Sequence, residues 1–197
     1  MRRRFALVLA LALAAATAAP ALAADVNLNW YPFAARSLDQ DFWDPIEDQY
    51  GGGVTVDMGA PGSPLHFAVG LHGSVGTEDF NNPLLINDAT GVISELSFGI
   101  AKVWETKGST RPFLSGGLSF VRAEVEADTV LGDVDDNDDS IGVWVEGGVY
   151  WRLSPHFNLG LFGRLLAGSN ITLFDEDGDA DYWEVGPMLG WSWPAKK

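Results

Sequence analysis

Few side chains in this sequence have the types that acid–base or nucleophilic chemistry requires. The chain of 197 residues has three histidines, His66, His72 and His156, and no cysteine. His66, His72 and Ser74 share one face of an alternating apolar–polar segment, which predicts a strand. Neighbours on one strand face lie about 6–7 Å apart, whereas a base must reach its nucleophile within hydrogen-bond distance. We therefore expect these histidines to fill a polar interior, and we expect no catalytic residue.

An acidic segment near the C-terminal end has the carboxylate-rich composition that Ca²⁺ prefers. It runs from Asp175 to Asp181 with Gly178 in the middle. An EF-hand loop has its glycine sixth and a bidentate glutamate twelfth, whereas here Gly178 stands fourth and Gly186 occupies the twelfth place. We therefore expect no cofactor and no metal-ligating residue, only loose attraction of divalent cations by a solvated acidic loop. Specific Ca²⁺ binding by this loop remains the alternative.

Charged residues also recur on the polar faces of the alternating segments. Glu146 and Arg164 lie almost equally far on either side of the turn at residues 154–155, so they are expected to oppose each other on neighbouring strands. A buried charge is tolerated only when it is paired and hydrogen-bonded. We therefore predict a structural ion-pair cluster that fills the interior and leaves no large water pore. Its expected members are Glu146, Arg164, Arg152, Glu184 and Glu95.

The elements that must position these side chains are eight segments of alternating apolar and polar residues. This period of two predicts strands at residues 26–31, 49–58, 65–74, 91–105, 111–126, 141–153, 157–173 and 182–193. Long acidic links are expected at 32–48, 77–90, 127–139 and 174–181, and the other three links are short turns rich in Pro, Gly and Ser.

The fifth segment does not alternate cleanly. Large apolar residues lie on both of its faces, at Leu114, Leu118 and Phe120 on one face and at Phe113 and Val121 on the other. Its facing therefore stays open, and a β-bulge is one explanation.

The first 23 residues have the features of a secretory signal peptide. Three arginines precede an apolar stretch, and the small-x-small sequence Ala21-Leu22-Ala23 follows Pro20. We expect cleavage near Ala23 and a single mature domain at residues 24–197, with a retained membrane anchor as the alternative. Removing three arginines changes the formal net charge of −15 to −18. Such an acidic chain is a poor candidate for binding nucleic acid, because phosphate contacts require Lys and Arg.

Tryptophans lie near the ends of the predicted strands, at Trp30, Trp104, Trp151, Trp183, Trp191 and Trp193. Indole rings prefer the membrane–water interface, and membrane barrels carry them as girdles. The expected fold class is therefore all-β, an eight-stranded antiparallel up-and-down transmembrane β-barrel, and a soluble β-barrel or sandwich is the alternative. Such barrels have long external loops and short periplasmic turns, so both termini are expected in the periplasm.

Several segments resemble small eight-stranded outer-membrane β-barrel proteins of the OmpA, OmpX and OmpW type. These segments are residues 94–99 (SELSFG), 111–118 (RPFLSGGL) and 148–153 (GVYWRL). The resemblance spans essentially the whole mature chain and implies location in the outer membrane of a Gram-negative-type bacterium, with assembly by the outer-membrane insertion machinery. The chain departs from that pattern where residues 194–197 follow the terminal aromatic Trp193.

Three functions from different classes fit these observations. The leading hypothesis is a structural or interaction barrel that presents acidic extracellular loops and contacts outer-membrane lipids and lipopolysaccharide, bridged by divalent cations. The second is a narrow channel for small hydrophobic molecules, as the OmpW-type resemblance implies. The third is an envelope lipid-modifying enzyme. The sequence identifies no ligand or receptor, and it leaves the oligomeric state open.

Overall fold

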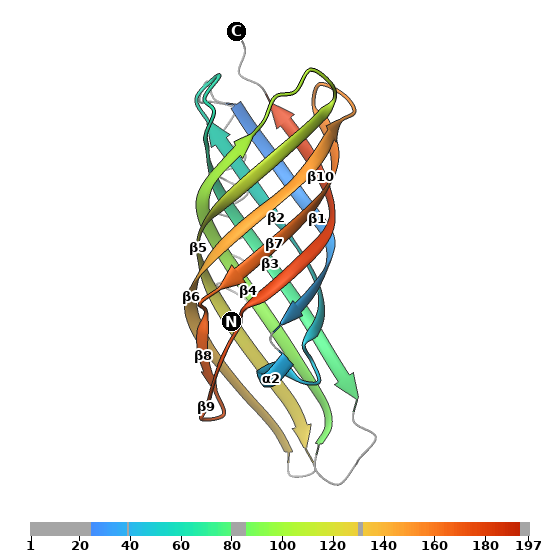
Figure 1. The fold of residues 1–197 in the computed structure, drawn as a ribbon. Helices are drawn as coiled ribbons and strands as arrows, with labels where there is room; N and C mark the ends of the chain where they lie inside the picture. Colours follow the sequence, from blue (N-terminus) through green and yellow to red (C-terminus); the bar gives the residue numbers. More distant parts are fainter. Residues whose placement is uncertain (1–24, 39, 80–85, 130–131, 194–197) are drawn as a thin grey trace.

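The computed structural model describes residues 25–38, 40–79, 86–129 and 132–193, and these residues form a closed β-barrel (Figure 1). The predicted signal peptide at 1–23 and the C-terminal residues 194–197 lie outside the described residues. Eight antiparallel strands pair in the order β1-β10-β7-β6-β5-β4-β3-β2, and β1 closes the barrel against β10. Their bounds are β1 Asp25–Leu38, β2 Asp48–Gly59, β3 His66–Asp79, β4 Ile86–Val103, β5 Thr110–Thr129, β6 Gly132–Arg152, β7 Phe157–Ala167 and β10 Tyr182–Trp193. The predicted fold class is confirmed.

Alternation decides which side chains face the interior of the barrel. In β10 the side chains of Trp183 and Val185 are about half exposed, at 50% and 46%, while Glu184 and Met188, at even-numbered positions of the same strand, are each 1% exposed. The facing of β5 is now settled as well. Phe113 and Val121 are buried inside, and Leu118 is exposed outside. The ladder between β5 and β6 runs without a register shift, so the bulge considered for this strand is absent, and large apolar residues simply occupy both faces.

The predicted first link at 32–48 is wrong in its first part, because β1 continues to Leu38. The pairing of β1 shifts register between Tyr31 and Ala34 against β2, and between Trp30 and Ala35 against β10. A β-bulge inserts an extra residue and changes which positions face inward. The buried positions nearest the bulge are Asn29 and Tyr31 before it, and Ala34, Arg36 and Leu38 after it.

The predicted acidic link at 127–139 is also wrong, because most of it is strand. β5 extends to Thr129 and β6 begins at Gly132, with Ala127 paired to Val134 and Val125 to Asp136. Aspartate has low strand propensity, but here the ladder of the partner strand continues and the carboxylates on the outer face remain in solvent. The link predicted at 77–90 is shortened in the same way, by β3 up to Asp79 and β4 from Ile86.

The predicted seventh strand at 157–173 is too long. β7 ends at Ala167, where Gly168 adopts a left-handed backbone with φ of 78°. The chain then forms a separate two-stranded sheet, β8 (Asn170–Leu173) and β9 (Glu176–Asp179), which replaces much of the link predicted at 174–181. A short helix, α2 (Gln40–Trp43), lies between β1 and β2.

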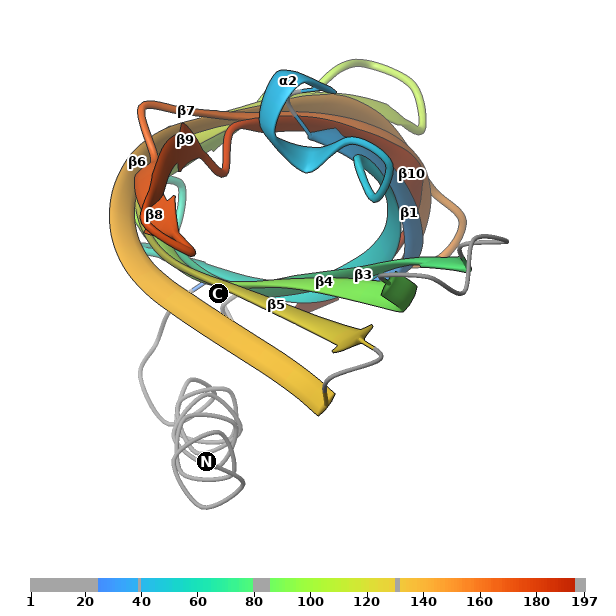
Figure 2. The same ribbon diagram turned by 90° about the horizontal axis from the view of Figure 1, so that it is seen from below.

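The long links gather at one end of the barrel, where α2, β8 and β9 lie over the wall strands (Figures 1 and 2). The indole nitrogen Nε1 of Trp43 donates a hydrogen bond to the carbonyl oxygen of Asp179 at 2.7 Å, which joins α2 to the β8–β9 sheet. Ile171 and Leu173 of β8 are each 2% exposed and belong to the same apolar cluster as Trp43 and Trp144. This end of the interior is therefore packed with apolar side chains. Within the described residues no helix has the length and apolar character needed to cross a membrane.

Candidate functional site: the charged cluster inside the barrel

Four charged residues of alternating sign face each other across four neighbouring strands. Glu146 of β6 pairs in register with Arg164 of β7, which pairs with Glu184 of β10, which pairs with Arg36 of β1. All four side chains are nearly inaccessible to solvent, with residue exposures between 1% and 3%. Because directly opposed cross-strand side chains interact, this register places each arginine beside a carboxylate of the neighbouring strand.

Arg164 is the centre of the cluster. Its Nη1 lies 3.3 Å from Oε2 of Glu146, and its Nη2 bonds to Glu95, which belongs to β4 on another part of the wall. Its Nε donates to the hydroxyl of Tyr182 at 3.0 Å. The guanidinium carbon lies 4.3 Å from the centre of the Trp144 ring. The guanidinium is therefore bonded on several sides, as a buried charge requires.

Arg36 and Glu184 form a second pair beside the first. The Nε and Nη2 atoms of Arg36 donate to Oε2 of Glu184 at 3.0 and 2.8 Å. The guanidinium carbon of Arg36 also lies 3.7 Å from the centre of the Tyr182 ring. Nδ1 of His72 lies 3.4 Å from Oε1 of Glu184, and neither atom has another hydrogen-bond partner. At this separation the contact is a weak ion pair when His72 is protonated, and it is not a good hydrogen bond.

Tyrosine hydroxyls connect the cluster to distant strands. Tyr31 of β1 donates to Oε1 of Glu146 of β6 at 2.7 Å, and Tyr182 of β10 donates to Glu95 of β4. Glu95 also accepts a hydrogen bond from Ser119 of β5. These strands are not neighbours in the barrel, apart from β4 and β5. The polar contacts therefore cross the interior and tie opposite parts of the wall together.

The structure brings four of the five predicted cluster residues together and leaves one out. Glu146, Arg164, Glu95 and Glu184 lie in the cluster, but Arg152 does not. The side chain of Arg152 is 32% exposed, and its Nη2 lies 3.9 Å from Glu105 at the end of the barrel that carries the short turns. Arg152 sits six residues closer to the 154–155 turn than Glu146 does, which is too far along β6 to reach the others.

Sequence reasoning missed Arg36, which lies in the stretch predicted as a link. Simple alternation from Tyr31 would also have turned Arg36 outward, because only the bulge after Tyr31 directs it into the interior. The contacts of Tyr31 and Tyr182 with the cluster carry no local sequence signal either, since their partners lie 115 and 87 residues away.

His72 and Ser74, which share one face of β3, each contact a different polar side chain. The hydroxyl of Ser74 donates to Gln49 at 2.6 Å, and Nε2 of His72 lies 3.3 Å from Oγ1 of Thr55. Across the described part of the chain, no group of three or more His, Cys, Asp or Glu side chains is arranged to hold a metal ion. In the predicted acidic link, Asp181 accepts hydrogen bonds from the backbone of residues 168 and 169, and Asp177 from Thr172. Asp181 therefore joins the two ends of the β8–β9 hairpin at its base, and Asp177 bonds across its two strands.

Solved structures with the same architecture identify the fold. Neisserial surface protein A is 16% identical over 87% of this chain and 97% of its own, with a TM-score of 0.50. Ail, the attachment invasion locus protein of Yersinia pestis, is 8% identical in its complex with the heparin analogue sucrose octasulfate, over 86% of this chain and 99% of its own, with a TM-score of 0.58. The fold is that of an eight-stranded outer-membrane β-barrel. Comparison with protein-family models and with curated proteins finds no match.

Proposed function

We propose that this protein is an outer-membrane β-barrel with a structural or interaction role, closed inside and acidic at its outer end. The observation that carries the proposal is the inversion of polarity across the wall. Ion pairs fill the middle of the interior, while large apolar side chains cover the outside, among them Phe67, Ile100, Leu118, Ile141, Val143, Leu161 and Leu165, each at least half exposed. Soluble proteins rarely expose an apolar surface of this extent, and a lipid bilayer covers it.

The aromatic residues support the same setting. Trp30, Trp104, Trp151, Trp183 and Trp193 are all exposed, between 37% and 50%. Trp183 lies at one end of β10 and Trp193 at the other. Trp104, Trp151 and Trp193 lie at the short-turn end of their strands and Trp183 at the opposite end, whereas Trp30 lies within β1. Exposed indole rings at both ends of the wall are typical of the interfacial girdles of a membrane barrel.

The proposed orientation places the end with α2, β8 and β9 outside the cell and both termini in the periplasm. It rests on the larger extensions at that end, which are α2, the β8–β9 sheet and the long β5–β6 hairpin, whereas the other end has only the turns at 60–65, 104–109 and 153–156. An epitope tag inserted between Thr129 and Gly132 should be labelled by antibody on intact cells. A matched tag in the Gly59–Leu65 turn between β2 and β3 should be labelled only after permeabilisation. The reverse pattern would overturn the orientation.

A closed interior separates this proposal from a channel. Purified protein in planar bilayers should show no steady, large single-channel conductance, because the charged cluster and the apolar cluster around Trp43 occupy successive levels of the interior. Steady conductance would favour the channel instead. An altered lipid A mass spectrum on expression would favour the enzyme, whereas an unchanged spectrum supports a non-enzymatic barrel.

The negative charge of the β5–β6 hairpin limits which molecules can bind at the proposed outer end of the barrel. On the outer face of the β5–β6 hairpin lie carboxylates at Glu124, Glu126, Asp128, Asp133, Asp135 and Asp139, together with Arg122. Ail was solved with a polyanionic heparin analogue, but this hairpin would repel polyanions. We propose lipopolysaccharide and outer-membrane lipids as contacts, bridged by divalent cations, with delivery by the outer-membrane insertion machinery. Lipopolysaccharide should co-purify with the protein in Mg²⁺ and be lost in EDTA; equal retention in both would contradict cation bridging.

A further inference from the structure

The buried charges of the interior do not balance. Within the described residues, the buried carboxylates inside the barrel are Asp57, Glu95, Glu146 and Glu184, and the guanidinium groups that face them are those of Arg36 and Arg164. Arg111, at 9% exposure, is paired with the exposed Glu105 at 2.7 Å and does not reach this set. With His72 neutral and all four carboxylates ionised, the interior would hold four negative and two positive charges.

Asp57 supplies one of the two excess negative charges, and the other arises because Glu95 and Glu146 share Arg164. Each of the three glutamates contacts an arginine. Asp57 is 6% exposed, and among the described residues it makes no ion pair. Its hydrogen bond comes from the neutral amide of Asn29, with Nδ2 at 3.0 Å from Oδ2. A buried carboxylate without a positive partner is costly in free energy unless something else compensates the charge.

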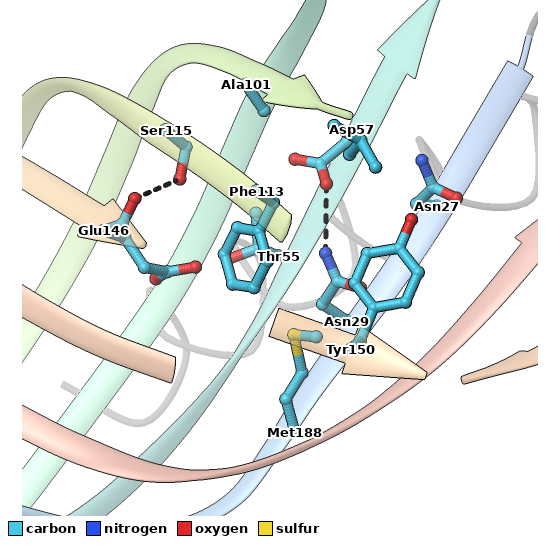
Figure 3. A pocket seen from close by; sticks show the side chains of 11 residues that line it. Asn27, Asn29, Thr55, Asp57, Ala101, Phe113, Ser115, Glu146, Tyr150 and Met188 are labelled. Carbon is cyan, nitrogen blue, oxygen red and sulfur yellow. Dashed lines mark hydrogen bonds between the residues drawn. The ribbon is translucent and has the colours of Figure 1, made fainter. Parts of the chain in front are cut away.

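A small cavity lies beside Asp57 (Figure 3). Its volume is about 10 Å³, and its polar lining includes Asp57, Glu146, Asn29, Thr55, Ser115 and Tyr150. No lysine, arginine or histidine lines it. All six side chains carry oxygen atoms, and a space of this size is about enough for one water molecule or one ion.

We infer that this cavity binds a single hard metal cation, with Asp57 as its charged ligand. Hard cations such as Ca²⁺, Mg²⁺ and Na⁺ are coordinated by carboxylate, amide, hydroxyl and water oxygens, which is the donor set of this wall. Glu146 adds negative charge nearby while both of its oxygens remain engaged with Tyr31 and Arg164. The site differs from the acidic outer hairpin in being buried, and it lies near the short-turn end of β2, two residues before Gly59.

The test uses the refolded full barrel in detergent micelles after EDTA treatment. Thermal unfolding is followed by the β-sheet circular dichroism signal, with CaCl₂, MgCl₂ or NaCl titrated separately at constant ionic strength. The wild-type midpoint should rise by several degrees and saturate with one of these cations. Asp57→Asn should abolish the rise, because it removes the charge and keeps the shape. The matched control Asp135→Asn, at an exposed carboxylate of the outer hairpin, should keep it.

Two results would overturn the site. One is a wild-type midpoint that responds to none of the three cations, which would mean that Asp57 is compensated in another way, such as by a proton. The other is a rise in Asp57→Asn equal to that of wild type, which would assign the effect to the outer acidic residues. If Asp57→Asn does not fold, Ser115→Ala serves instead. It should raise the half-saturating cation concentration severalfold, and an unchanged concentration would refute the cavity as the site.

Discussion

Replacing Arg164 by methionine is expected to destabilise the folded barrel by about 3–5 kcal/mol, the usual cost of removing one partner of a buried ion pair. The guanidinium contacts both Glu95 and Glu146, and the side chains of Arg164 and Glu95 are completely inaccessible to solvent. Methionine retains the unbranched stem that packs near Trp144, so little of the loss comes from a new cavity. The loss comes from two carboxylates that remain buried without their cation.

The matched control is Arg122→Met on the β5–β6 hairpin. Arg122 also contacts two carboxylates, Glu124 at 2.7 Å and Asp139 at 3.0 Å, but these carboxylate side chains are 39% and 72% exposed. Exposed ion pairs contribute about 0–1 kcal/mol, so this variant should unfold nearly as wild type does. The two variants therefore make the same chemical change at a buried and at an exposed position.

The assay is equilibrium unfolding in urea from lipid or detergent, followed by tryptophan fluorescence and by the gel mobility of the folded barrel. The double variant Arg164→Met with Glu95→Gln should recover part of the loss, because it removes one of the two unpaired charges. If Arg164→Met is no less stable than Arg122→Met, the ion-pair cluster does not stabilise the barrel and the reasoning is wrong.

Two further predictions concern the wall and the outer end. Gly117→Ala should strongly reduce the yield of folded barrel, because a Cβ there would overlap the carbonyl oxygen of Phe98 on β4. The control Gly163→Ala, whose added Cβ would lie 3.7 Å from its nearest atom, should refold as wild type. Equal refolding yields of the two variants would contradict this overlap. The backbone N–H of Phe174 bonds to the exposed carboxylate of Asp136 at 2.6 Å and lowers its pKa. The pKa of Asp136 is therefore lower in the folded than in the unfolded chain, so the contact stabilises β8 fully at pH values above the usual Asp pKa of about 3.9 and is lost as pH falls through the folded pKa. The amide NMR signal of Phe174 should shift with pH as Asp136 is protonated. A pH-independent signal would refute the contact.

Alternation along the chain was sufficient to predict the barrel and the facing of most strands. A period of two leaves only one choice once one face must be apolar, so Glu184, Glu146 and Arg164 could be placed inside from their neighbours alone. The opposition of Glu146 and Arg164 followed from one short turn, since hairpin geometry links register to loop position.

Contacts that depend on closure or on an irregular backbone required the tertiary structure. Arg36 enters the cluster only because the bulge after Tyr31 reverses its facing. Pro32 lies at this bulge, and from the sequence alone it indicated the end of the strand. Residues 127–129 and 132–139 form strand because their partners extend equally far, which overrides the low strand propensity of aspartate. The bond from Arg164 to Glu95 crosses the interior between β7 and β4. Local sequence determines which face a side chain occupies, whereas closure of the barrel decides which side chains meet across it.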